Sequence, residues 1–183
     1  MSRIIIVGDG PGGLSAALFL SKNGHETTVL GTDETAMHYA YLRNYLGFPE
    51  IAGTEFQARA RAQVESHGTV IRNEEAASIV ADEKFKVTLD GGETLESDYL
   101  ILTEGKNPAL AKSLDLDTDD SGAIVVDRDY RSSLDRVYVV GRSARPERSQ
   151  AIISAGAGAT AALDILAREA GKSVQDWDTP PKE

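Results

Sequence analysis

A glycine-rich turn near the start of the chain constrains the fold more than any other feature. In VGDGPGG, Gly8, Gly10 and Gly13 form a G-x-G-x-x-G pattern that follows the apolar run Arg3–Val7 and precedes a helix-forming stretch at 14–22. In such a turn the first glycine allows the tight bend, the second lets a pyrophosphate approach the backbone, and the third lets helix and strand pack closely. Amide hydrogens at the start of the helix then face the phosphates. The pattern predicts a dinucleotide-binding strand–turn–helix unit; a glycine-rich turn without a ligand stays the alternative.

The rest of the chain alternates short apolar strands with helices, which indicates a parallel sheet with crossover helices. Residues 32–49 are irregular and too long for a simple connector. Strands at 77–81, 84–89 and 93–96 are predicted to form an antiparallel β-meander. In the last helix, an Ala-Gly-Ala-Gly-Ala stretch predicts close helix–sheet packing. Further elements are expected as strands at 26–30, 69–72, 98–103, 123–126 and 137–140, and as helices at 54–67, with Thr54 as its N-cap, and 151–170.

Length and composition fit one packed domain of this kind. The 183 residues, 41% of them apolar, suffice for one sizeable core and are few for two. The predicted fold is α/β, a single Rossmann-like domain of three layers with an accessory β-meander. We expect it to span residues 1–173, with a polar linker at 106–121 and a flexible acidic tail at 174–183.

Charge and residue content argue against several classes of function. The 19 Lys and Arg against 29 Asp and Glu give a net charge of −10, so nucleic acid and anionic membranes would be repelled. The absence of cysteine excludes disulfides and thiolate chemistry within this chain, and the 3 histidines share no metal-ligand spacing. The acidic balance fits either an ordinary acidic protein or one adapted to high salt. Without a long apolar run or a signal-peptide pattern, the sequence predicts a cytoplasmic protein with no membrane partner and no metal.

Four later segments occur in an order typical of one group of flavoproteins. Residues 43–68 carry RNYLGFPE before a helix, and residues 85–105 form a meander that ends in Thr-Glu-Gly. Residues 122–142 read GAIVVDRDYRSSLDRVYVVGR, and residues 150–166 read QAIISAGAGATAALDIL. With the glycine-rich turn, these segments make nearly the whole chain resemble the thioredoxin reductase-like FAD-dependent pyridine nucleotide-disulfide oxidoreductases. The resemblance implies the FAD-binding domain of that family, with FAD as cofactor and a homodimer as assembly.

The resemblance also implies which residues would hold the cofactor. The glycine-rich turn would cradle the pyrophosphate, and the residues after the second strand would lie near the adenine ribose. Asn44 would sit beside the isoalloxazine ring, and the start of the last helix would face the flavin N1/O2 edge, where negative charge develops on reduction. No catalytic residue is assigned. The full implied set is Gly8, Gly10, Pro11, Gly12, Gly13, Thr32, Asp33, Asn44, Ala76, Thr103, Glu104, Gly105, Gly141, Arg142, Gln150 and Ala151.

Two positions that would face the ligand depart from the expected pattern. An acidic residue usually ends the second strand and holds ribose hydroxyls, but Gly31 stands there, and Asp33 follows shortly after. Either the ribose is held differently or the site has decayed. Arg142 replaces the family's aspartate beside the ribityl chain and cannot accept that hydrogen bond. A solvated arginine, a new phosphate contact and a partner-docking residue are the alternatives for Arg142.

The second domain of a full reductase has no room between the segments of this chain. Such a reductase inserts a nicotinamide-binding domain, with a Cys-x-x-Cys pair, before the stretch that here begins at Gly122. Only residues 106–121 separate Gly105 from Gly122, whereas a domain of that kind needs on the order of 100 residues. The chain is therefore predicted not to be a self-sufficient thioredoxin reductase.

Three hypotheses on function follow. The leading one is an FAD-binding, oxidoreductase-like protein that needs an external electron donor or a redox partner. The rival is a degenerate, non-catalytic module that has lost flavin and serves nucleotide binding, regulation or dimerisation. A third is binding of NAD or another adenine nucleotide at the first loop.

Overall fold

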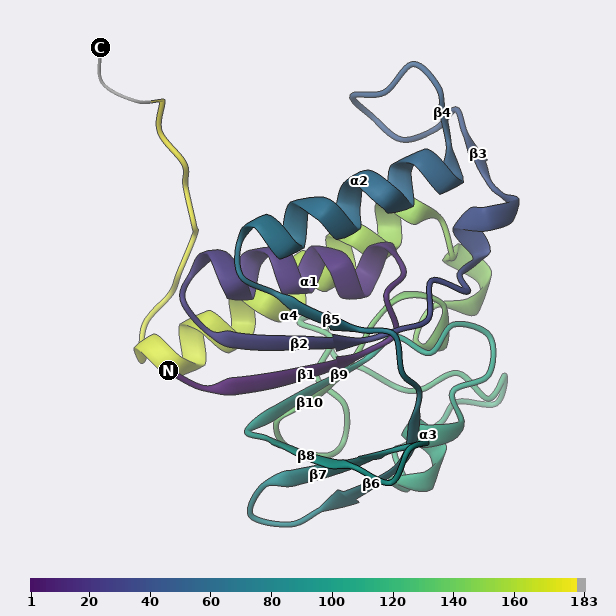
Figure 1. Ribbon diagram of the computed structural model, residues 1–183. Helices are drawn as coiled ribbons and strands as arrows, with labels where there is room; N and C mark the ends of the chain where they lie inside the picture. The colour runs from purple at the N-terminus through teal and green to yellow at the C-terminus, as the bar shows by residue number, and fades with distance from the viewer. Residues whose placement is uncertain (181–183) are drawn as a thin grey trace.

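The centre of the protein is a parallel β-sheet. A computed structural model describes residues 1–180; residues 181–183, the end of the expected acidic tail, lie outside the described residues. The sheet has 5 strands in the order β10-β9-β1-β2-β5 (Figure 1). The central strands β9 and β1 (after Arg3) are continuous buried apolar runs, as is typical of parallel strands covered on both faces. The strands are β1 (Arg3–Val7), β2 (Glu26–Leu30), β5 (Val70–Arg72), β9 (Tyr99–Leu102) and β10 (Val137–Val139).

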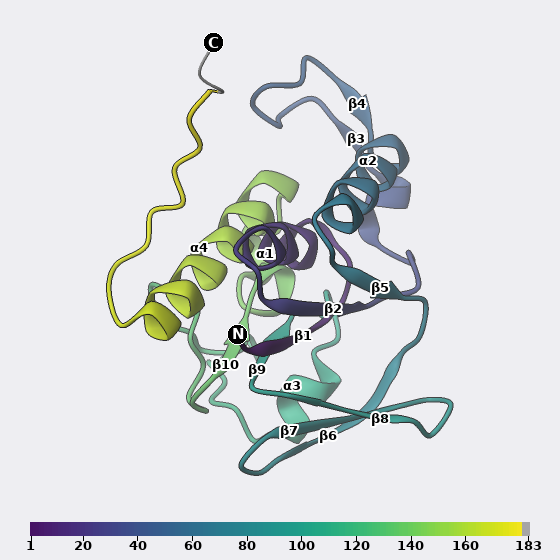
Figure 2. The same cartoon turned by 60° about the vertical axis from the view of Figure 1, so that its left-hand side comes forward.

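Different layers cover the two faces of this sheet (Figure 2). Along β1, Ile4 and Ile6 join the core beneath the helices, while Ile5 and Val7 join a second core with Phe85. This arrangement confirms the predicted three-layer α/β domain with a β-meander. The helices on one face are α1 (Pro11–Lys22), α2 (Gly53–Ser66) and α4 (Ala151–Ala170), and the antiparallel sheet on the other consists of β6 (Ala76–Ala81), β7 (Phe85–Leu89) and β8 (Thr94–Ser97).

Shorter elements fill the connections. The predicted linker at 106–121 contains one short helix, α3. The described part of the tail has no helix or strand, and Lys22 Nζ holds its start through Asp176 Oδ2 at 3.1 Å and Asp178 Oδ2 at 2.6 Å. The remaining elements are η1 (Ala36–Tyr39), β3 (Tyr41–Leu42), β4 (Ile51–Ala52), α3 (Ala109–Ser113), η2 (Gly141–Ser143) and η3 (Pro146–Arg148), with β3 and β4 paired.

Two expectations for single elements are wrong. Residues 123–126 form no strand, because Ile124 makes only an isolated antiparallel bridge with Thr118 and its amide bonds instead to the carbonyl of Ser143 in a loop. Thr54 is not the N-cap of α2. The helix begins one residue earlier, with Ala52 as its N-cap and without a capping side chain.

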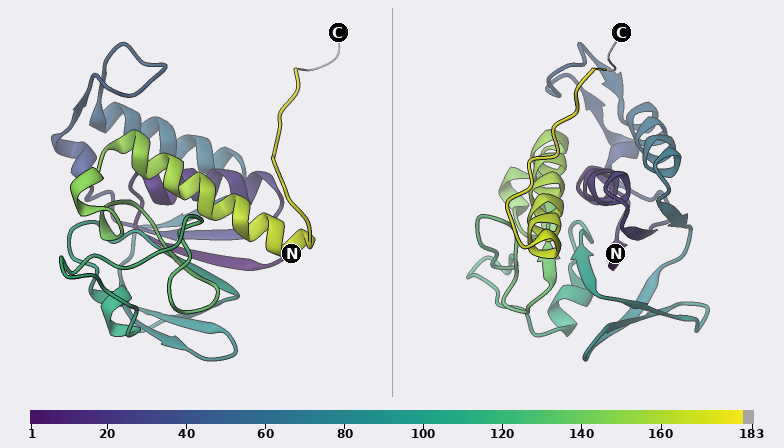
Figure 3. Two further views of the ribbon diagram at one scale, coloured as in Figure 1. Left: turned by 180° about the vertical axis from the view of Figure 1, so that it is seen from behind. Right: turned by 90° about the vertical axis from the view of Figure 1, so that its left-hand side faces the viewer.

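Glycine makes the close approach between α1 and α4, which run along one another (Figure 3). A Cβ on Gly158 would lie 1.9 Å from the carbonyl oxygen of Gly12. Within the Ala-Gly stretch, Gly158 therefore packs against α1, while Ala157 is buried in the core that also contains strand residues, so the stretch contacts a helix as well as the expected sheet side. By length and composition alone α4 could span a membrane; in this fold its glycine face packs on α1.

Candidate functional site

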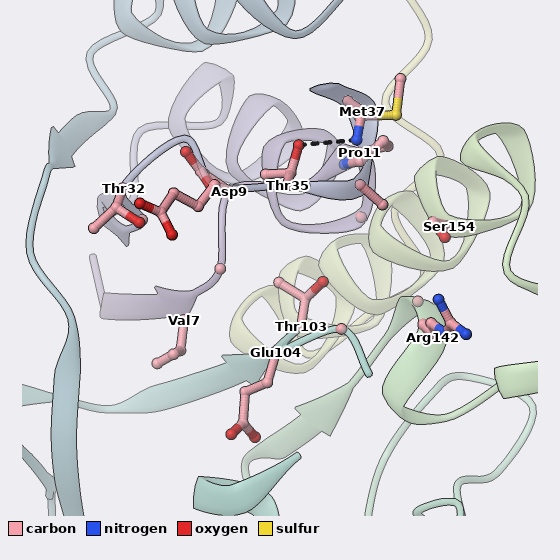
Figure 4. A pocket seen from close by; sticks show the side chains of 18 of the residues that line it. Val7, Asp9, Pro11, Thr32, Thr35, Met37, Thr103, Glu104, Arg142 and Ser154 are labelled. Carbon is pink, nitrogen blue, oxygen red and sulfur yellow. Dashed lines mark hydrogen bonds between the residues drawn. The ribbon is translucent and has the colours of Figure 1, made fainter. Parts of the chain in front are cut away.

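A cavity of about 520 Å³ opens at the carboxyl ends of β1, β2 and β9 (Figure 4). The chain passes from β1 to β2 on one side and later returns on the other side as β9, so the sheet order reverses beside β1. Open α/β sheets bind ligands at such a switch point. Of the implied cofactor-binding residues, those that line the cavity are Gly8, Gly10, Pro11, Gly12, Thr32, Ala76, Thr103, Glu104, Gly105, Gly141, Arg142 and Ala151.

The glycine-rich turn forms one wall of this cavity. Gly8 has a φ of +104°, and a Cβ there would lie 2.5 Å from the Thr103 carbonyl oxygen, so both conformation and space require glycine. A Cβ on Gly13 would lie 2.1 Å from the Gly8 carbonyl oxygen, and Gly13 packs inside the turn instead of lining the cavity. Gly10 has open space in front of its Cα, and no side chain caps the start of α1. The first amides of α1 are thus free for an anion.

A second uncapped helix start lies across the cavity. Ala151 begins α4, and the N-cap residue Gln150 offers no side-chain cap. Arg142 and Ser154 flank this end (Figure 4), and Arg142 is exposed. The two helix starts give the cavity two positions that favour negative charge.

Asn44 and Gln150 meet each other outside the cavity lining. The side-chain amide of Asn44 donates to Gln150 Oε1 at 2.9 Å. This bond joins the loop after β3 to the start of α4, so the structure brings the two predicted residues together at the rim.

The end of the cavity that the resemblance assigns to the adenine is acidic. Thr32 and Ala76 line it, together with Glu34, Glu74 and Glu75. Asp33 does not line it. Its φ is +64°, and its carboxylate lies 3.3 Å from His38 Nε2.

Asp9, inside the glycine-rich turn, is a cavity residue for which the sequence predicted no role. It is 3% exposed, and its carboxylate forms an ion pair with Arg61 of α2. Its backbone carbonyl accepts a hydrogen bond from Gln57 Nε2 at 2.6 Å. Burial raises the pKa of Asp9, and the Arg61 guanidinium opposes that rise. An acid within the turn, in a chain that lacks the acid after β2, was the signal available in the sequence.

Glu104 lines the cavity, and its carboxylate is bonded to the protein backbone. Its carboxylate accepts the amides of Leu110 at 2.7 Å and Ala111 at 2.9 Å, and so holds the start of α3. Burial raises the pKa of Glu104, although these amide hydrogen bonds favour the charged form. The residue therefore fastens the short linker to the cavity wall.

Comparison with known proteins places the chain in a family. Residues 41–159 match the family model for pyridine nucleotide-disulphide oxidoreductases. The chain belongs to this family. Within it, the chain is 30% identical to a Staphylococcus aureus alkyl hydroperoxide reductase subunit over 108 residues, a match that covers 56% of this chain and 21% of the relative. It is 33% identical over 109 residues to a thioredoxin reductase of Claviceps purpurea, with 55% of this chain and 33% of the relative covered. The matches thus span at most a third of the curated relatives' length.

Solved structures agree on the fold. A thioredoxin reductase from Gloeobacter violaceus superposes with a TM-score of 0.86 at 17% identity, covering 97% of this chain and 99% of that one. The atypical thioredoxin reductase of Desulfovibrio vulgaris Hildenborough gives 0.82 at 17% identity, covering 91% and 97%. The predicted resemblance is confirmed: the protein has the FAD-domain fold of thioredoxin reductases.

The residues of the cavity fit a flavin dinucleotide, the cofactor of this family. The open space at Gly10 suits a pyrophosphate against uncapped amides. The lining of the cavity includes both Ala76 and Ala151 at the start of α4. Among residues 1–180, no group of three or more His, Asp or Glu side chains is arranged to hold a metal ion.

Proposed function

We propose that the protein binds FAD and acts as a flavin-dependent oxidoreductase that receives electrons from a separate donor. The observation that carries the proposal is one cavity that joins two uncapped helix starts at the switch point of the sheet. Membership of the family supports the choice of FAD over other dinucleotides.

The chain's own residues would bind and orient the cofactor. The turn at Gly10 and the start of α1 would hold the pyrophosphate. The start of α4 at Ala151 would face the flavin and favour the reduced, negatively charged form by about 0.3–1 kcal/mol. When bound, FAD would supply electron-transfer chemistry that none of these side chains provides.

The proposal of a separate donor is supported by what lies between β9 and β10. Residues 106–121 hold α3 and no nicotinamide domain, and the chain has no cysteine. The reductant is therefore proposed to reach the flavin from outside this domain, either as a small donor or from a redox protein.

The first test is a visible absorption spectrum after incubation with FAD and desalting. A retained flavin band is expected for the wild-type protein. Gly10→Val should lose it, because the side chain would fill the space next to the free amides of α1. Gly91→Val is the matched control, since Gly91 also has open space but lies in the turn of the meander. A wild-type protein that stays colourless overturns the proposal.

A non-catalytic module is the second candidate, and Arg142 is the observation that favours it. If Arg142 contacts a phosphate, Arg142→Asp should weaken FAD binding. If the arginine is the change that abolished flavin binding, the same substitution should restore it. Calorimetric titration with NAD and with ADP tests the third hypothesis, an adenine nucleotide in the first loop.

We also propose a homodimer or a docked redox partner at the rim of the flavin end. Support comes from large apolar side chains exposed on the η1–β4 segment and on the start of α4. The exposed apolar side chains are Tyr39, Tyr41, Leu46, Phe48, Ile152 and Ile153. Light scattering of the purified chain, alone and with FAD, measures its mass and would refute the dimer if only a monomer is found.

A further inference from the structure

The space normally taken by an acid after the second strand is filled in this protein from another part of the chain. Gly31 stands at the end of β2, where dinucleotide sites usually carry the acid that holds the ribose. A Cβ on Gly31 would lie 2.4 Å from Cγ of Asp9 and 2.6 Å from its Oδ1. The Asp9 carboxylate thus packs directly on Gly31, and any larger residue there would displace it.

The other described residues that bond to the Asp9 carboxylate engage only one of its two oxygens. Its Oδ2 receives the Arg61 guanidinium and the amide of Asp33, the latter at 3.0 Å. Among residues 1–180, no other residue donates a hydrogen bond to Oδ1. Asp9 and Thr32 lie on the same wall of the cavity (Figure 4). Its protein partners therefore fix the carboxylate in place, and Oδ1 can still accept a hydrogen bond from a ligand.

We propose that Asp9 has taken over ribose recognition from the missing acid, so that its carboxylate accepts hydrogen bonds from the ribose hydroxyls of the adenosine half. The inference rests on the proposed binding of an adenine dinucleotide and adds the residue that selects its sugar. An ionised carboxylate only accepts hydrogen bonds, which suits hydroxyl donors. Arg61 fixes its orientation, and Gly31 provides the room. The acid has changed position in the sequence while staying at the same end of the cavity.

A purely structural ion pair between Asp9 and Arg61 is the competing explanation. A buried pair is weak evidence for a stabilising role, because desolvation of both charges opposes their attraction. A structural role explains the glycine after β2, because Asp9 packs on it, but gives no reason for a carboxylate oxygen of a cavity residue that no other described residue bonds. The two explanations differ in whether the identity of the sugar matters.

The test uses ligand pairs, so it does not depend on any variant folding. Calorimetry of the full chain compares ADP with 2′,3′-dideoxy-ADP, which lacks both ribose hydroxyls. The wild-type protein should bind ADP more tightly by about 10- to 100-fold. Asp9→Ala should abolish that preference, whereas Arg61→Gln should keep most of it. Equal binding of the two ligands by the wild-type protein overturns the role of Asp9 but leaves FAD binding intact.

A swap variant gives a second readout. Asp9→Ala combined with Gly31→Glu moves the acid back to the end of β2 and removes the side chain with which it would collide. The double variant should regain the preference for ADP that Asp9→Ala loses, a coupling that a structural ion pair does not predict. Failure to regain it in a folded double variant counts against the proposal. If the wild-type protein binds neither FAD nor ADP, the proposed function and this inference fail together.

Discussion

The contact between α1 and α4 offers the sharpest test of the fold. The test adds one methyl group to α4, either at Gly158 or at Gly156. In Gly158→Ala the new Cβ would lie 1.9 Å from the Gly12 carbonyl oxygen and 3.0 Å from the amide nitrogen of Ala16. Both atoms belong to backbone, so the helices must separate. Gly156→Ala places the same methyl in the same helix with nothing within 4 Å. The pair therefore isolates the contact from helix propensity.

The expected magnitudes have opposite signs. Replacing glycine by alanine within a helix stabilises it by about 0.8–1 kcal/mol, and Gly156→Ala should show this gain alone. Overpacking costs about 1–3 kcal/mol, and a clash with rigid backbone belongs at the upper end, so Gly158→Ala should lose about 2 kcal/mol net. For a domain of this size, 1 kcal/mol shifts Tm by about 2–4 °C. We thus expect Tm to fall by about 4–8 °C for Gly158→Ala and to rise by about 2–4 °C for Gly156→Ala.

Thermal unfolding followed by circular dichroism, with apoprotein and at one protein concentration, measures both shifts. The Gly158→Ala protein should also bind FAD more weakly, because the displaced Gly12 belongs to the glycine-rich turn. If both variants raise Tm by similar amounts, the helices do not meet at Gly158 and the reasoning is refuted.

Three further predictions concern polar contacts. Tyr138→Phe removes the hydroxyl that donates to Asp164 at 2.6 Å. It should lower the free energy of unfolding, measured with urea, by about 1 kcal/mol. An unchanged free energy of unfolding would show that this hydrogen bond does not stabilise the fold. Burial opposes ionisation of Asp164, but hydrogen bonds from Arg131 and Tyr138 outweigh it and keep the Asp164 pKa below its usual value. The wild-type protein should therefore lose this stabilisation as pH falls below about 4, and its urea midpoint should fall more steeply there than that of Asp164→Asn. An equal fall of the midpoint in both proteins would contradict this. Glu104→Ala frees the amides at the start of α3 and should speed their hydrogen exchange by about 10-fold; unchanged exchange would show that Glu104 does not hold the linker.

Much of the fold could be predicted from the sequence, because the signals involved are local. The buried parallel strands, the meander and the long last helix follow from runs and periods of a few residues. The predictions of a helix start at Thr54 and of a strand at 123–126 were wrong, because both features depend on which loop lies beside the segment and accepts its hydrogen bonds. Local patterns contain no information on that neighbour.

The order of residues along the chain was enough to establish the glycine-rich turn, the family and the lack of room for a nicotinamide domain between residues 105 and 122. It did not reveal that Asp9 fills the space at Gly31, or that the Glu104 carboxylate holds the start of α3; both emerged from the folded arrangement. The same reason explains why the sequence alone did not reveal the roles of the two residues. A side chain's role depends on which atoms lie around it, and residues distant in sequence supply those atoms. Spacing along the chain predicts where a backbone turns, whereas contacts across the fold decide which charge faces the cavity.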